Sequence, residues 1–286
     1  MSGAPRRITL FSHGRIDDTG PAVQRLVDAA AAAGVEVLIP HGEAEKHDIS
    51  EREGCRLGVD PSEDTDVAVV FGGDGTILNA LRSCASSEAP VFAFNYGAIG
   101  FLSTVEREDL DDGIARLLEG RYEVLGMPAL AVELDGQRRV GVNDISLHRR
   151  PNSRVALLGY SVRGDQLGQV RCDGLVAATP VGSTGYNLAN GGPILAWGVE
   201  GFVVSFIAPH TLTARALVVA PDDVLTVHNL SDTDPVDVAT DNRSVAELAP
   251  GAEIEVHFVQ DQVRLAQVEG ANFYHRIRAK FGRLAY

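Results

Sequence analysis

A single carboxylate set among glycines is the feature of this sequence best suited to chemistry. The stretch Gly72-Gly73-Asp74-Gly75-Thr76 follows an apolar run at residues 67–71 and precedes helical spacing at residues 77–82. Glycines permit a tight turn and the close approach of a ligand, and amide groups at a helix N-terminus bind phosphate. A carboxylate beside phosphates is unfavourable unless it binds Mg²⁺ or takes a proton from an attacking hydroxyl. The alternative is that Asp74 is an ordinary N-cap in a tight turn.

Three further stretches carry polar groups that suit a nucleotide. Asn95-Tyr96-Gly97 opens a second glycine-rich stretch, and Asn143-Asp144 could bind a ribose diol, although an ordinary turn explains that pair equally well. Residues 172–193 collect glycines, hydroxyls and one tyrosine away from any strand pattern. They could bind sugar hydroxyls, phosphate or a base. The alternative is an ordered structural loop, which would be unusually long without a ligand.

Apolar runs that alternate with helical segments predict a parallel sheet with crossover helices in the first part of the chain. A helix is expected to begin at Gly20-Pro21 and end at Gly34, and residues 41–61 are expected to form a surface loop with one short helix. Ligands of open α/β sheets bind outside the carboxyl ends of the strands. We therefore expect both glycine-rich stretches to face one cleft. The predicted strands lie at residues 7–11, 35–39, 67–71 and 90–94.

Strand-like alternation with short turns dominates from residue 121 to about residue 265. The predicted fold class is α/β plus all-β. Residues 1–120 would form a Rossmann-like open parallel sheet, completed by residues 266–286, and residues 121–265 would form a β-rich, β-sandwich-like domain. The last helix, at residues 273–281, is expected to pack back on the first domain.

The composition of the chain argues against several classes of function. The 286 residues carry a formal net charge of −14, which argues against nucleic acid or an anionic membrane as a partner. We expect neither a signal peptide nor a membrane span. Cys55, Cys84 and Cys172 are scattered without a metal-binding spacing, as in reduced thiols of a cytoplasmic protein. His13 is expected to be structural rather than catalytic.

Taken together, the motifs resemble those of the NAD kinase family, which phosphorylates the 2′-hydroxyl of the adenosine ribose of NAD. The resemblance rests on GGDGT at residues 72–76, NYGAIGFL at 95–102, ND at 143–144, CDGLVAATPVGSTGYNLANGGP at 172–193 and APHTLTARAL at 208–217. GGDGT also occurs in diacylglycerol and sphingosine kinases and, in similar form, in phosphofructokinases. The long stretch at residues 173–193 is much more specific.

The resemblance implies a role for each motif. Asp74 would be the general base, Phe101 would line the adenine pocket, and Asp173 would contact the nicotinamide end. The phosphoryl donor would be ATP or polyphosphate, with a divalent cation, Mg²⁺, held chiefly by its phosphates. Self-association as a dimer or tetramer is also implied. The residues implied to bind substrate or nucleotide are Gly72, Gly73, Gly75, Thr76, Asn95, Gly97, Phe101, Asn143, Asp144, Arg154, Arg171, Asp173, Thr184, Gly185, Tyr186, Asn187, Leu188, Ala189, Ala208 and Arg243.

Several positions depart from the family pattern. Asp144 stands where Glu is usual, Gly185 and Ala189 stand where the family has Ala and Ser, and Arg243 could favour a more negative ligand. These changes leave the donor and the choice between NAD and NADH open. Two other functions stay open: a lipid or sugar kinase that uses the same turn, and a non-catalytic NADP sensor.

Overall fold

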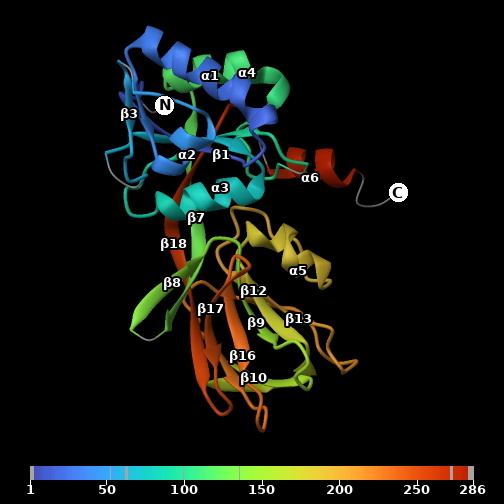
Figure 1. The fold of residues 1–286 in the computed structure, drawn as a ribbon. Helices are drawn as coiled ribbons and strands as arrows, with labels where there is room; N and C mark the ends of the chain where they lie inside the picture. The colour runs from blue at the N-terminus through green and yellow to red at the C-terminus, as the bar shows by residue number, and fades with distance from the viewer. Residues whose placement is uncertain are drawn as a thin grey trace. The chain divides into compact units, whose positions relative to one another are not determined.

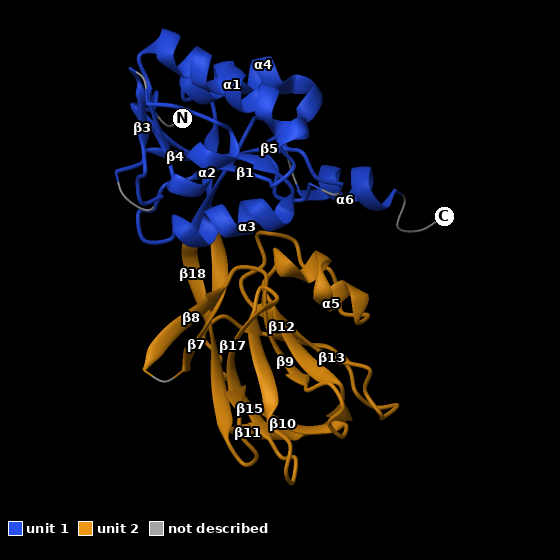
Figure 2. Cartoon of the chain, viewed as in Figure 1, with its two compact units in different colours: residues 1–126, 263–286 blue, residues 127–262 orange. Residues whose placement is uncertain are grey.

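A computed structural model describes residues 3–51, 53–61, 64–98, 100–134, 136–270 and 273–282 (Figure 1). Ile99, in the second glycine-rich stretch, lies outside the described residues. The chain divides into two compact units (Figure 2). Unit 1 comprises residues 1–126 and 263–286, and unit 2 comprises residues 127–262. The predicted fold class, α/β plus all-β, is confirmed.

Unit 1 is built on a parallel sheet with the strand order β5-β4-β1-β2-β3. The hydrophobic residues of β5, β4, β1 and β2 are buried on both faces of the sheet, as expected of a parallel sheet covered by helices, whereas the edge strand β3 is partly exposed. β5 also pairs in parallel with β6 (Val105–Glu106) and, at Leu265, with the end of β18 (Glu253–Gln267). The five strands are β1 (Arg7–Ser12), β2 (Glu36–Ile39), β3 (Cys55–Leu57), β4 (Val67–Gly72) and β5 (Val91–Asn95).

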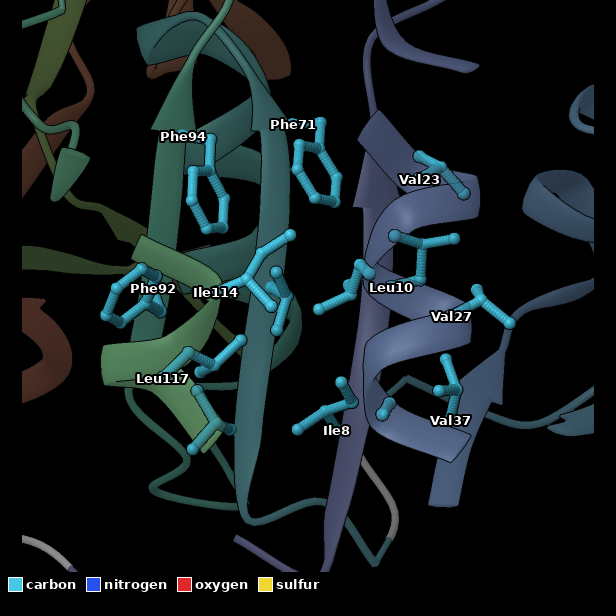
Figure 3. Packing of buried hydrophobic residues seen from close by; sticks show 14 of the residues in the cluster. Ile8, Leu10, Val23, Val27, Val37, Phe71, Phe92, Phe94, Ile114 and Leu117 are labelled. Atoms are coloured by element: carbon cyan, nitrogen blue, oxygen red, sulfur yellow. The ribbon is translucent and has the colours of Figure 1, made fainter. Parts of the chain in front are cut away.

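The core of unit 1 lies between the sheet and two of its helices. α1 contributes Val23 and Val27, and α4 contributes Ile114 and Leu117 (Figure 3). The rings of Phe71 and Phe94 stack on the same side of the sheet, with centroids 4.9 Å apart. This packing holds the ends of β4 and β5 in place. The helices of unit 1 are α1 (Ile16–Ala33), α2 (His41–Lys46), α3 (Asp74–Ser83), α4 (Leu110–Leu118) after the 3₁₀ turn η1 (Arg107–Asp109), and α6 (Phe273–Phe281).

Two sequence predictions in unit 1 were wrong in detail. α1 begins at Ile16 rather than at Gly20-Pro21, because the Arg15 carbonyl already accepts the amides of Asp18 and Thr19. Pro21 therefore lies inside the helix. The segment 41–61 contains α2 and also the short strand β3, which pairs with β2 at the edge of the sheet. Three residues are too few to show a strand period.

Unit 2 contains an antiparallel six-stranded sheet in the order β14-β13-β12-β9-β16-β17. A second antiparallel set, β11-β10-β15-β18, shares its core, and β7 and β8 form a hairpin. The remaining strands are β7 (Glu123–Leu134), β8 (Gln137–Gly141), β9 (Asp144–Arg149), β10 (Ala156–Val162), β11 (Asp165–Cys172), β12 (Gly174–Ala178), β13 (Phe202–Ile207), β14 (Leu217–Val219), β15 (Leu225–Asn229), β16 (Val236–Thr240) and β17 (Arg243–Leu248).

The stretch 172–193 is not one loop, contrary to the sequence prediction. Its first part forms β12, which is fully buried between β9 and β13. A buried inner strand needs only a short run of small apolar residues, so it shows no alternation. The turn η2 (Gly182–Thr184) and the short helix α5 (Tyr186–Ala189) follow. None of the described helices is long and apolar enough to cross a membrane.

Candidate active site

The glycine-rich turn connects β4 directly to α3. Gly73 is the N-cap residue, and its carbonyl accepts the amides of Thr76 and Ile77 at 2.9 and 3.1 Å. Asp74 is the first residue of the helix and makes no capping bond, so the N-cap interpretation of Asp74 was wrong. The turn thus leaves the Asp74 side chain available for another role beside the helix N-terminus.

Two backbone amides fix the orientation of the Asp74 carboxylate. Oδ2 accepts the amide of Phe101 at 3.1 Å, and Oδ1 accepts the amide of Leu102 at 3.0 Å. Each carboxylate oxygen has two acceptor positions. Both oxygens therefore keep capacity for a further donor, such as a substrate hydroxyl, while the carboxylate is held in one orientation.

The two glycine-rich stretches meet at the ends of neighbouring strands. Gly72 of β4 is paired with Asn95 of β5, and the Tyr96 amide donates to the Gly72 carbonyl at 3.0 Å. The Asn95 side chain accepts the Gly97 amide at 3.0 Å and donates to Glu106 at 2.7 Å. The two stretches thus lie side by side, in agreement with the expectation that both face one cleft.

A cleft of about 830 Å³ opens at these strand ends within unit 1. The guanidinium group of Arg107 lies over the Tyr96 ring, 5.5 Å from its centroid, and the His13 ring accepts the Arg15 amide through Nδ1 at 3.1 Å. The cleft is mostly polar, with cationic groups that suit an anion. It is lined by Ser12, His13, Gly14, Arg15, Asp18, Gly73, Gly75, Thr76, Asn79, Tyr96, Gly97, Ala98 and Arg107.

Sequence reasoning missed the cationic part of this cleft. Arg15 and Arg107 belong to no motif, and His13 was expected to be structural, yet all three line it. Their position in the sequence, after segments predicted to end at the carboxyl side of the sheet, could have indicated that they line the cleft. Arg15 follows the first predicted strand, and Arg107 begins the helical segment after the second glycine-rich stretch.

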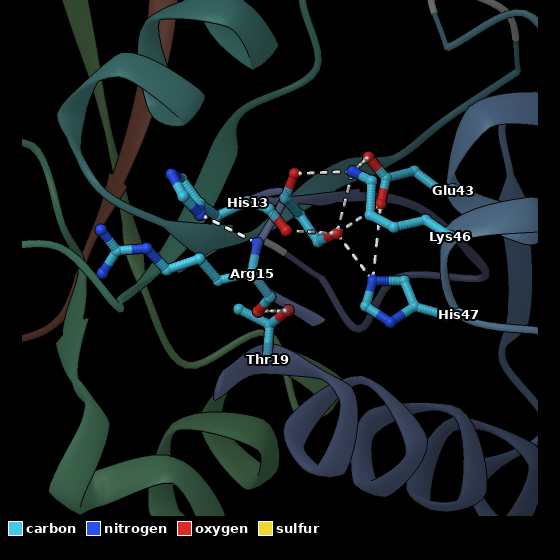
Figure 4. A network of polar contacts seen from close by, with 7 residues as sticks. His13, Arg15, Thr19, Glu43, Lys46 and His47 are labelled. Carbon is cyan, nitrogen blue, oxygen red and sulfur yellow. Dashed lines mark hydrogen bonds and ion pairs between the residues drawn. The ribbon is translucent and has the colours of Figure 1, made fainter. Parts of the chain in front are cut away.

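A partly buried polar network joins Glu43, Lys46 and His47 to the edge of the cleft at Ser12 (Figure 4). The Ser12 hydroxyl donates to Glu43 at 2.5 Å and lies 2.7 Å from Nε2 of His47. The Lys46 ammonium donates to the Ser12 carbonyl at 3.0 Å and pairs with Glu43 at 2.7 Å. Burial lowers the pKa of His47, although Glu43 opposes this effect. The network ties α2 and the residue after it to the end of β1.

In unit 2, the Asn143-Asp144 pair is held by a second carboxylate. The Asp241 carboxylate accepts the amides of Val142, Asn143 and Asp144 at 3.1, 2.7 and 3.2 Å. Asp144 is 7% exposed. Burial, and next the charge of Asp241, raise the pKa of Asp144 from 3.8 to about 7. Asp144 is therefore a carboxyl that can carry a proton near neutral pH and donate a hydrogen bond.

The stretch 172–193 returns to the Asn143-Asp144 pair. Ala178 of β12 lies opposite Asp144, and the Thr179 amide donates to the Asn143 carbonyl at 2.9 Å. A Cβ on Gly182 would lie 2.0 Å from the same carbonyl, so only glycine fits there. The two motifs predicted to bind the nucleotide are thus brought together within unit 2.

The residues predicted on α5 and the turn before it are mostly exposed. Tyr186 stacks on His148 of β9, with centroids 5.6 Å apart and planes 12° apart. Burial raises the pKa of Tyr186, as do the charges of Asp144 and Asp173. Asn187 differs, because its side chain is fully buried and donates to the carbonyls of Ser183 and Pro193, both at 2.9 Å. The residues with exposed or partly exposed side chains or backbone are Thr184, Gly185, Tyr186, Leu188 and Ala189.

The other predicted residues of unit 2 lie before, within and after these motifs in the sequence. Asp173 forms an ion pair with Arg149 at 2.5 Å, a partner that the sequence did not indicate. Ala208 has a φ of 43°, an uncommon conformation for a residue other than glycine. Arg154, Arg171 and Arg243 are exposed. Among the described residues no three His, Cys, Asp or Glu side chains are grouped as a metal site would require.

The fold and these two sets of residues define a class: an α/β unit with a glycine-rich turn between a strand and a helix, joined to a β-rich unit that brings the Asn143-Asp144 pair and the stretch 172–193 together. Comparison with known proteins specifies the class. The model of the ATP-NAD kinase N-terminal domain matches residues 25–122, and that of the C-terminal domain matches residues 142–268. The chain belongs to the NAD kinase family, whose reaction is the phosphorylation of NAD to NADP.

Relatives agree with this assignment. The chain is 32% identical over 273 residues to an NAD kinase of Gemmatimonas aurantiaca, covering 92% of this chain and 91% of that protein. It is 34% identical over 233 residues to an NAD kinase of Thermobifida fusca, covering 78% and 72%.

Two solved structures share the fold. Yeast NADH kinase complexed with NADH superposes with a TM-score of 0.86 at 22% identity, covering 100% of this chain and 91% of that one. An NAD kinase from Archaeoglobus fulgidus in complex with ATP gives a TM-score of 0.72 at 24% identity, covering 96% and 97%.

Proposed function

We propose that Asp74 is the general base of NAD phosphorylation and accepts the proton of the 2′-hydroxyl of the adenosine ribose. The observation that carries this proposal is the pair of backbone amides from Phe101 and Leu102 that orient the Asp74 carboxylate. A ribose hydroxyl is too weak an acid to ionise at neutral pH. A positioned base contributes about 10²–10⁴-fold in typical cases.

The cleft of unit 1 is the proposed site for the phosphates of the donor. Its support is the combination of Arg15, Arg107 and His13 with the N-terminus of α3, since guanidinium groups and helix amides both bind phosphate. ATP and polyphosphate present the same terminal phosphoryl group. The relative in complex with ATP favours ATP.

A divalent cation, Mg²⁺, would accompany the donor. Mg²⁺ is commonly held by phosphate oxygens and waters together with one or two protein oxygens. Phosphates bound in the cleft would supply most of the ligands of this cation. Mg²⁺ would neutralise charge on the phosphates, while the residues of this chain would position and deprotonate the acceptor.

Unit 2 is the proposed NAD-binding domain; its residues 127–262 lie within the range 121–265 that the sequence predicts for this domain. Asn143, Asp144 and Tyr186 would hold the adenosine, since Asp144 can both donate and accept and Tyr186 is fixed by stacking on His148. Asp173, Arg154, Arg171 and Arg243 would add polar contacts to the dinucleotide. The relative complexed with NADH supports binding of a dinucleotide by this fold.

Self-association through unit 2 is also proposed, as a dimer or tetramer. Leu212 is 94% exposed, and Leu217 and Val218 lie exposed on β14, at the edge of the six-stranded sheet. Exposed apolar edges of this kind favour pairing with another chain.

A cytoplasmic location is proposed as well. The three cysteines are free and buried, which supports a reducing, cytoplasmic location.

The test is NADP formation by the purified protein with Mg²⁺, with NAD or NADH as acceptor and ATP or polyphosphate as donor. Product from one donor and acceptor pair identifies the substrates. No product from any pair, together with tight NADP binding, would overturn the kinase proposal in favour of an NADP sensor.

A further inference from the structure

Arg276 of α6 lies behind the backbone segment that holds Asp74. Its side chain is buried, and the residue is only 8% exposed. Nη1 donates to the carbonyl of Phe101 at 3.1 Å and approaches the carbonyl of Gly100 at 3.4 Å. Nη2 donates to the Gln267 side chain. Three acceptors thus fix the plane of the guanidinium group.

The same two peptide groups contact both Arg276 and Asp74. The peptide between Gly100 and Phe101 offers its carbonyl to Arg276 and its amide to Asp74. The peptide between Phe101 and Leu102 does the same. The carbonyl and amide of a trans peptide point in opposite directions, so the cation and the carboxylate lie on opposite sides of this segment. A cation on the carbonyls polarises each peptide and strengthens the hydrogen bond from its amide.

We propose that Arg276 is a positioning residue for Asp74, acting through the Gly100–Phe101 and Phe101–Leu102 peptides. The inference rests on the proposed role of Asp74 as the base. It adds that the orientation of this base depends on an arginine about 200 positions later in the chain, and that α6 is part of the machinery for deprotonating NAD.

The chemistry of the position favours this role over simple packing. A buried arginine costs free energy that an apolar side chain of similar volume would avoid. Burial lowers the pKa of Arg276, and the charges of Glu106 and Asp74 act to raise it. The planar guanidinium group can hold two carbonyls and Gln267 at once, which a lysine ammonium cannot do with the same geometry.

Arg276→Met keeps the length of the side chain and removes the charge and donors. We expect kcat to fall about 10–100-fold, since a misplacement of about 1 Å can cost 10²-fold in rate. KM for NAD and Kd for NADP should change by less than about twofold. Arg276→Lys keeps the charge and should recover part of kcat. Arg278→Met is the matched control, because Arg278 lies on the same helix with an exposed side chain.

A double-mutant cycle separates positioning from general destabilisation. If Arg276 acts through Asp74, Arg276→Met should have almost no further effect on the residual rate of Asp74→Asn. Equal fold-losses in both backgrounds, or wild-type kcat in Arg276→Met, would overturn the inference. Should Arg276→Met fail to fold, Arg276→Lys in both backgrounds gives the same comparison. A near-normal rate in Asp74→Asn itself would instead overturn the proposed base, so the two failures are distinguishable.

Discussion

Gly73 and Gly97 lie back to back at the ends of two neighbouring strands, so close that a Cβ on Gly97 would be 2.6 Å from the Gly73 Cα. The obstacle is backbone, which cannot rotate away as a flexible side chain would. The glycine-rich turn before α3 and the segment leading to Phe101 and Leu102 therefore share one backbone contact. Any side chain at this point must separate them.

Gly97→Ala should lower kcat about 10-fold or more, because the displaced segment carries the amides that orient Asp74. Steady-state rates of NADP formation measure the effect. Gly42→Ala is the control, since a Cβ on Gly42 would meet nothing within 4 Å. Wild-type kcat in Gly97→Ala would show that the contact is not needed.

Arg15→Gln and Arg107→Gln should each raise KM for the phosphoryl donor about 10-fold and leave KM for NAD nearly unchanged. At the proposed donor site, each substitution would remove one charge-assisted contact to phosphate, worth roughly 1.5–3 kcal/mol. Arg25→Gln is the matched control, because Arg25 is an exposed arginine of α1 paired with Asp111. An increase in KM for NAD, with KM for the donor unchanged, would show that the cleft binds NAD and not the donor.

Asp144 should make stability depend on pH. Its pKa is raised from 3.8 to about 7 on folding, so the folded state retains a proton that the unfolded chain has lost between these values. Stability from this group is present below about pH 4 and falls as pH rises towards 7, by up to about 4 kcal/mol. The Asp144→Asn variant has no carboxyl group at this position, so its stability should not show this fall with rising pH.

Urea unfolding of wild type and Asp144→Asn at pH 4.5 and pH 8 measures the effect. The free energy of unfolding of the variant, relative to wild type, should be higher at pH 8 than at pH 4.5. A difference that is the same at both pH values would contradict a raised pKa for Asp144.

The three thiols should not react in the folded protein. Cys55, Cys84 and Cys172 are all buried, and burial raises the pKa of Cys84 to about 12 and of Cys172 to about 11. Because the thiolate is the reactive form, an aromatic disulfide reagent at pH 8 should label fewer than one thiol until urea unfolds the chain. Rapid labelling of all three without urea would mean that the core is open.

The sequence predicted the parts of the fold that depend on local pattern. The strands at residues 67–71 and 90–94, the turn around Asp74 and the last helix all have strong apolar runs, glycines or helical spacing. β3 and β12 were missed because one is three residues long and the other is a small apolar run inside a glycine-rich stretch. The start of α1 was predicted too late in the chain, because Pro21 was taken as the first helical position and in fact lies inside the helix.

The residues that support the motifs were harder to predict. Arg276 contacts the segment around Phe101, and Asp241 contacts the amides of Asn143 and Asp144 about 100 positions earlier. Such contacts join residues that are far apart in the sequence and meet only in the folded chain. No local spacing of residues indicates them. Arginine at an exposed helix position and at a buried one also look alike in sequence, as Arg278 and Arg276 do.

The most direct test of the account is the rate of NADP formation by Asp74→Asn beside its affinity for NADP. Asparagine keeps the size of the side chain and cannot accept the proton of the ribose hydroxyl. We predict a fall in kcat of about 10²–10⁴-fold, with Kd for NADP within about threefold of wild type. A variant that keeps more than about a tenth of the wild-type rate would contradict the assignment of Asp74 as the base.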